Sequence, residues 1–117
     1  MQDRSEVTIT LRGGQPTTQY STTFLQGMVN RMLTSYHKYG HIRDAILAGV
    51  DPIQSCHQRV GKYLETGNTE YLMDAANYLM AEYMHPSHES AHFDAESRSP
   101  GRTLRDGRIT DKHSEDL

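Results

Sequence analysis

The chain has 117 residues and a formal net charge of −3, from 12 basic and 15 acidic side chains. This length allows one small domain, and the nearly balanced charge argues against general nucleic-acid binding and against attachment to a membrane surface. Only 35% of the residues are hydrophobic, which predicts a thin core and therefore a homo-oligomer in which association covers apolar surface.

The single cysteine, Cys56, excludes an internal disulfide framework and is typical of a reducing compartment. The first ten residues lack the apolar segment of a signal peptide, and no apolar run reaches the roughly 18 residues of a membrane span. We therefore expect a cytoplasmic protein with no membrane partner.

The N-terminal residues 1–21 are expected to form an extended arm. Val7, Ile9 and Leu11 alternate with polar residues in a short strand-like pattern, which Gly13 and Gly14 interrupt. Because one isolated strand is marginally stable, this arm either pairs with a second copy or stays flexible.

Residues 22–39 are predicted to form the first long helix, with Gly40 at its end. Its apolar residues recur at spacings of three and four and predict a face turned toward the core: Phe24, Leu25, Met28, Val29, Met32, Leu33 and Tyr36. A shorter helix is expected from Ile42 to Ala48, ended by Gly49.

The third helix has a clear start signal, in which Asp51 caps the helix, Pro52 takes its first position and Gln54 completes a capping pattern. Its apolar stripe comprises Ile53, Cys56, Val60, Tyr63 and Leu64. Gly67 is expected to end this helix and Asn68 to cap the next, so that the two helices form an αα-hairpin.

The last helix is predicted to end before His85 and Pro86. Its apolar side comprises Leu72, Met73, Ala76, Leu79, Met80 and Tyr83. Residues 87–117 lack apolar periodicity and predict a flexible, disordered tail. The expected fold is all-α, a small helical bundle of three long helices and one short helix over residues 22–86, which associates through its methionine-rich apolar faces.

One side of the last helix carries the candidate chemistry. On a helical wheel, the side nearly opposite Leu72, Leu79 and Met80 is polar and gathers Glu70, Asp74, Asn77, Tyr78, Ala81 and His85. Two carboxylates one turn apart suit a hard cation, so Glu70 and Asp74 are candidate ligands for Mg²⁺. The same spacing is typical of the solvated face of an amphipathic helix, and this simpler reading is favoured for the pair alone.

Cationic residues suggest a binding site rather than a catalytic one. Arg31 and Lys38 share a face of the first helix with Ser35, and Arg59 and Lys62 lie on the third. If they converge on the last helix, Arg31 or Arg59 could hold a phosphate, Tyr36 or Tyr78 could stack on a base, and Asn77 could read it. Ordinary surface charges and salt bridges are the alternative.

The segments RMLTSYHKYG, QRVGKYLETGN and EYLMDAANYLM together resemble the small all-α nucleoside triphosphate pyrophosphohydrolases of the MazG-like superfamily, over about residues 24–102. The chain is also similar to short uncharacterised proteins of actinobacteria and their phages that share the stretch around TGNTE and MHP and an SPGR motif. This second similarity suggests a phage or mobile-element protein.

The resemblance to the hydrolases is incomplete at the metal site. Asp74 matches the aspartate of their Glu-x-x-Asp motif, but Tyr71 stands at the glutamate position and Glu70 lies one residue earlier. The first helix also has no acidic residue to supply their Glu-x-x-Glu pair.

We therefore expect a non-catalytic protein that binds a nucleotide, another small molecule or a partner on a degenerate pyrophosphohydrolase-like scaffold. The alternative is a Mg²⁺-dependent pyrophosphohydrolase that completes its metal site with Glu65 or Glu82. In either case Asp74 and Asn77 are expected to face a polar cavity, with Arg31, Lys38 and Arg59 as the available partners.

Overall fold

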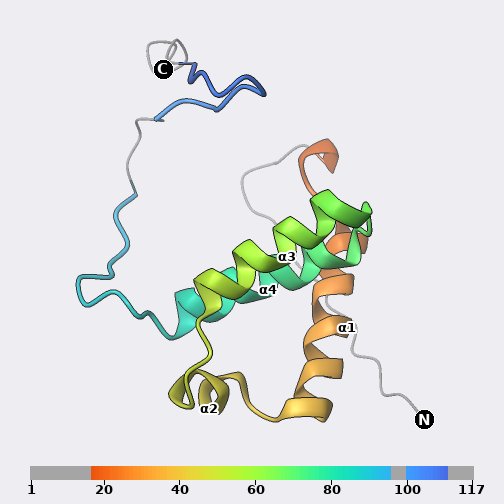
Figure 1. Cartoon of the computed structure of the whole chain (residues 1–117), viewed down its shortest axis with the longest axis vertical. Coiled ribbons are helices and arrows are strands. Elements are labelled where there is room, and N and C mark those ends of the chain that lie inside the picture. Colours follow the sequence, from red (N-terminus) through yellow and green to blue (C-terminus); the bar gives the residue numbers. More distant parts are fainter. Residues whose placement is uncertain (1–16, 96–99, 111–117) are drawn as a thin grey trace.

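The computed structural model describes residues 17–95 and 100–110, and this part of the chain is helical (Figure 1). A short 3₁₀ helix, η1 (Thr17–Gln19), precedes the α-helices α1 (Thr22–Tyr39), α2 (Ile42–Leu47), α3 (Pro52–Thr66) and α4 (Glu70–Met84). The all-α prediction, with three long helices and one short helix, is confirmed for these residues. The predicted strand-like pattern at residues 6–11 lies outside them.

Helices α3 and α4 form the predicted hairpin. The Asp51 carboxylate accepts a hydrogen bond from the Gln54 backbone N–H at 3.1 Å, and Pro52 opens α3. Gly67 ends α3 in the left-handed conformation at φ 77°, which a residue without Cβ adopts at little cost. These local signals place the two ends of α3 where the sequence predicts them.

The start of α4 differs by one residue from the prediction. Thr69, rather than Asn68, occupies the N-cap position and makes no side-chain capping bond. The Asn68 side chain nevertheless accepts a hydrogen bond from the Glu70 backbone N–H at 3.0 Å. Asn68 therefore satisfies an N-terminal donor of α4 from one position further out than expected.

Helix α1 crosses α4, and α2 leads the chain from the end of α1 back to α3 (Figure 1). The Ser21 side chain caps α1 by accepting a hydrogen bond from the Phe24 N–H at 3.0 Å. At the crossing, a Cβ added to Gly27 would lie 2.4 Å from Met73 Sδ. The absence of a side chain at Gly27 therefore allows α1 to approach α4 closely.

The core is small and belongs to the hairpin. Within the described residues the buried hydrophobic side chains are Cys56, Ala75 and Ala81. None of the residues of α1, all of which are described, is buried. The predicted core face of α1 is therefore less buried than expected: Phe24 to Leu33 are partly exposed along this face, and Tyr36 is exposed.

Helix α4 is turned differently from its predicted orientation. Leu79 and Tyr83, assigned to the apolar core side, are 52% and 77% exposed. Asn77 and Ala81, assigned to the polar side, are the residues that are buried, with Ala81 only 1% exposed. The polar side of α4 is therefore partly turned inward, while Met73 of the apolar side still lies against Gly27 of α1. The small side chain of Ala81 permits close packing that Leu79 would not.

After α4, residues 100–110 form a turn that the prediction of a disordered tail does not include. An isolated antiparallel bridge joins Thr103 to Ile109, and the Leu104 N–H donates to the Arg108 carbonyl at 2.7 Å. The backbone and side chain of Arg108 both donate to the Asp106 carboxylate, which lowers the pKa of Asp106. In the described part of the chain, no helix is long and apolar enough to cross a membrane.

Candidate functional site

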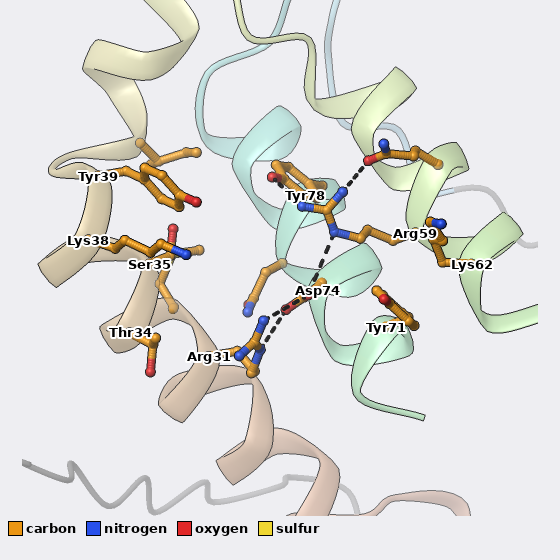
Figure 2. A pocket seen from close by; sticks show the side chains of 14 residues that line it. Arg31, Thr34, Ser35, Lys38, Tyr39, Arg59, Lys62, Tyr71, Asp74 and Tyr78 are labelled. Atoms are coloured by element: carbon orange, nitrogen blue, oxygen red, sulfur yellow. Dashed lines mark hydrogen bonds and ion pairs between the residues drawn. The ribbon is translucent and has the colours of Figure 1, made fainter. Parts of the chain in front are cut away.

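A cavity of about 400 Å³ lies between α1, α3 and α4 (Figure 2). Arg31, Ser35 and Lys38 of α1 face Arg59 and Lys62 of α3 across it, with α4 between them. Five of the ligand-binding residues proposed from the sequence line this cavity together with Asp74: Arg31, Lys38, Arg59, Asn77 and Tyr78. A volume of this size is within the range of small-molecule sites.

Asp74 is the centre of the charged network. Arg31 donates to it through two nitrogens, from Nε to Oδ1 at 2.9 Å and from Nη2 to Oδ2 at 3.1 Å. Arg59 approaches the same carboxylate from α3, with its Nε 3.6 Å from Oδ2. The Asp74 side chain is only 15% exposed. The structure thus confirms that Asp74 is shielded from bulk solvent and paired with basic side chains.

This network raises the pKa of Arg31. The hydrogen bond from Arg31 to Asp74 is the main cause that raises the pKa of Arg31, and burial opposes it. The charges of Asp74 and Glu70 add to the increase. Arg31 therefore stays protonated and connects α1 to α4 as a fixed cation.

Glu70 lies outside the cavity lining, with its Oε2 3.5 Å from Arg31 Nη1. Arg31 therefore contacts both carboxylates proposed for Mg²⁺. The additional candidates are engaged elsewhere, since Glu65 pairs with Lys62 at 3.4 Å and Glu82 accepts hydrogen bonds from Ser87. Among the described residues, no group of three histidines, cysteines or carboxylates could hold a metal ion. A Mg²⁺ site at Glu70 and Asp74 stays a prediction, and its formation would require Arg31 to move.

Arg59 is held by neutral groups as well as by Asp74. Its guanidinium carbon lies 5.4 Å from the centre of the Tyr78 ring, within the range of a cation–π contact. It also donates to Gln58 Oε1 and, at 3.5 Å, to Tyr78 Oη. These contacts orient Arg59, and they cover part of the Tyr78 ring that was expected to stack on a base.

Lys38 is less constrained than the two arginines, whereas Lys62 pairs with Glu65. Lys38 Nζ lies 5.2 Å from the ring centre of Tyr39, and Lys38 makes no ion pair with any carboxylate of residues 17–95 and 100–110. The cavity lining thus contains two arginines and two lysines against the single carboxylate of Asp74. This local positive excess contrasts with the net charge of −3 of the whole chain.

Asn77 lies deep between α1 and α4 and is 6% exposed. Its Nδ2 donates to the Met28 carbonyl at 2.9 Å. Because only the amide nitrogen can donate to a carbonyl, this bond fixes the orientation of the side chain. The other amide atom, Oδ1, is buried without a hydrogen-bond partner among the described residues.

A second cavity, of about 520 Å³, adjoins the first and has an almost entirely apolar lining. The two linings share Met32, Ser35, Ile42 and Asn77. Tyr36, proposed as a base-stacking residue, lines this second cavity and not the first. We call the two spaces the cationic cavity and the apolar cavity.

Several residues of the cationic cavity were not proposed as ligand-binding residues from the sequence: Thr34, Tyr39, Gln58 and Tyr71. Helical spacing could have indicated all four. Thr34 lies three residues after Arg31, Tyr39 four after Ser35, Tyr71 three before Asp74, and Gln58 four before Lys62.

A scan of known family models finds no match to this chain, and searches of curated proteins and of solved structures find none either. The resemblance to MazG-like hydrolases therefore rests on the sequence pattern and stays a prediction.

Proposed function

We propose that the chain binds a small phosphate-bearing molecule, a nucleotide or nucleotide derivative, without hydrolysing it. The observation that supports this is the excess of cationic side chains around one cavity. Guanidinium and ammonium groups form strong, charge-assisted hydrogen bonds with phosphate oxygens. Tyr71 and Tyr78 add aromatic surface beside these cations, on which a flat ring could pack.

The state of Asp74 favours binding over hydrolysis. Metal-assisted phosphate chemistry needs carboxylates that are free to hold Mg²⁺. Here Arg31 takes both oxygens of Asp74 and also lies near Glu70. Asp74 therefore holds Arg31 in place, and Lys38, which makes no ion pair within the described residues, is left for a ligand.

Lys38 offers the most direct test, because it lines the cavity without joining the Asp74 network. We expect ATP and inorganic pyrophosphate to bind in isothermal titration calorimetry, and Lys38→Ala to weaken binding by about tenfold. Arg43→Ala is the matched control, since Arg43 is an exposed cation of α2 outside the lining. Equal losses in both variants would indicate nonspecific charge attraction and contradict the proposal.

The hydrolase alternative retains one favourable observation, the match of Asp74 to the family aspartate. Release of pyrophosphate from a panel of nucleoside triphosphates, with Mg²⁺ or Mn²⁺ present, separates the two functions. We expect no turnover. Turnover that Asp74→Asn abolishes would instead establish the chain as an enzyme.

We also propose that the chain works in the cytoplasm as a homo-oligomer. Leu64, Leu79 and Tyr83 are more than half exposed on α3 and α4, although the described core is small. A second copy that covers such side chains would supply the apolar burial that one copy lacks. Light scattering after size exclusion should give a mass above one chain, and Tyr83→Glu should lower it. A native chain that stays monomeric at all concentrations would contradict this.

A further inference from the structure

We propose that the ligand is amphipathic: its phosphate occupies the cationic cavity and an apolar group of the same molecule occupies the apolar cavity. The phosphate half of this inference rests on the proposed function. The apolar half rests on separate observations, which concern the second cavity and its border with the first.

The two cavities are placed for one molecule to span them. They share the lining residues Met32, Ser35, Ile42 and Asn77, so they meet along a common border. Their volumes, about 400 and 520 Å³, each suit part of a small ligand. A molecule that enters the cationic cavity with its charged end therefore has an adjoining space for the remainder.

The chemistry of the two linings is sharply different. The apolar cavity is bounded mainly by hydrophobic side chains of α1, including Leu25, Met28 and Val29, with Met80 from α4. The residues of α1 on this face are partly exposed, and none of them is fully buried. An alkyl or other apolar group placed there would remove this surface from water, which is favourable in proportion to the area covered.

Asn77 provides an independent sign of a ligand at the border. A buried amide oxygen without a hydrogen-bond donor is unfavourable, and such groups usually have a partner. Asn77 Oδ1 has none among the described residues, although Asn77 belongs to both linings. A hydroxyl or amide N–H between the two ends of the ligand would satisfy it, once the side chains that cover the oxygen shift aside.

The test uses a pair of probes that differ only in apolar length. We expect n-octyl phosphate, kept below its micellar concentration, to bind at least about tenfold more tightly than ethyl phosphate in calorimetry. Val29→Trp fills the apolar cavity, and it should remove this advantage while leaving the affinity for pyrophosphate unchanged. Met80→Gln is a second, smaller change in the same lining, and circular dichroism verifies that both variants fold.

The outcomes separate the two proposals. If pyrophosphate and both alkyl phosphates fail to bind, the proposed function is wrong. If ethyl and octyl phosphate bind equally, phosphate binding stands and the amphipathic ligand is overturned. An octyl advantage that survives Val29→Trp and Met80→Gln would also overturn it, because the chain would then bind elsewhere.

A separate binding experiment tests whether Asn77 accepts a hydrogen bond from the ligand. We expect 2-hydroxyoctyl phosphate to bind more tightly than octyl phosphate to the native chain, and with equal affinity to Asn77→Leu. Equal affinities for the native chain would overturn the assignment of a ligand donor to Asn77 Oδ1.

Discussion

The α3–α4 hairpin and α1 are held in place by different kinds of contact. The hairpin contains the buried residues Cys56, Ala75 and Ala81, small side chains that let two helices pack closely. Helix α1 buries no residue; besides its close approach to Met73 at Gly27, it is joined to α4 by polar contacts, from Arg31 to Asp74 and from Asn77 to the Met28 carbonyl.

This difference indicates which part of the molecule can respond to a ligand. The hairpin depends on buried residues outside the lining of the cationic cavity, whereas the Arg31–Asp74 contact that joins α1 to α4 belongs to that lining. Elements with few buried contacts open at lower free energy than the core. We therefore expect a ligand to stabilise α1 more than the hairpin.

The largest expected effect comes from breaking the hairpin itself. Ala81 is 1% exposed, so Ala81→Leu has no room for its added atoms. We expect the free energy of unfolding in urea to fall by up to about 3 kcal/mol, because overpacking forces the helices apart. Ala91→Leu, at an exposed position after α4, should change it by less than about 0.5 kcal/mol. Similar results for the two variants would show that the hairpin is not the core.

Breaking the contact that attaches α1 to α4 should lower the free energy of unfolding less than Ala81→Leu does, and its effect should be confined to α1. Asp74→Ala leaves Arg59 without its carboxylate and Arg31 with only Glu70. We expect a loss of about 1–2 kcal/mol, moderated because the arginines are partly exposed. Hydrogen exchange should show α1 losing protection while α3 keeps most of it.

The exposed aspartate of α2 gives the control for this change. Asp44→Ala removes a carboxylate that makes no ion pair within the described residues, and it should leave α1 protected. Equal loss of protection in α1 and α3 after Asp74→Ala would contradict the distinction between the two regions.

A smaller effect is expected at the corner of the hairpin. Gly67 has φ 77°, and nothing lies within 4 Å of an added Cβ, so Gly67→Ala introduces backbone strain without a clash. The expected loss is about 1 kcal/mol in thermal or urea unfolding. Gly61→Ala makes the same chemical change inside α3, also in open space. It should instead stabilise the chain by up to about 1 kcal/mol. If both variants changed the free energy of unfolding in the same direction, this account would be contradicted.

The smallest expected effect is that of raising the pH. Arg31 has a raised pKa in the folded chain, so its stabilising contact is present below the ordinary arginine pKa and is lost only above the raised value. The attachment of α1 should therefore be constant from about pH 7 to about pH 10. The Nε–H resonance of Arg31 should stay visible by NMR as that of exposed Arg43 broadens, and simultaneous loss of both signals would contradict the Asp74 bond.

The helices could be predicted because their signals are local. Asp51 and Gly67 act on backbone groups within a few residues, and their roles do not depend on what packs against α3. The start of α4 was less certain, because Asn68 and Thr69 can both precede a helix and only the backbone conformation distinguishes them.

Helix orientation could not be predicted in the same way. The apolar stripe of α4 indicated that Leu79 faces the core, but close approach of two helices favours Ala81 at the contact. The gathering of Arg31, Lys38 and Arg59 around one cavity was anticipated as a possibility, since each lies on an identifiable helix face. The apolar cavity beside them depends on the crossing of α1 over α4, which no local pattern specifies.

Because Cys56 is buried, the rate of its chemical modification can report how fast the α3–α4 hairpin opens. Cys56 is the single cysteine of the sequence and lies within the hairpin, out of reach of a thiol-modifying reagent. A disulfide reagent can therefore react only during moments when α3 separates from α4. At high reagent concentration, the rate of modification becomes the opening rate of the hairpin, a quantity that equilibrium unfolding does not supply.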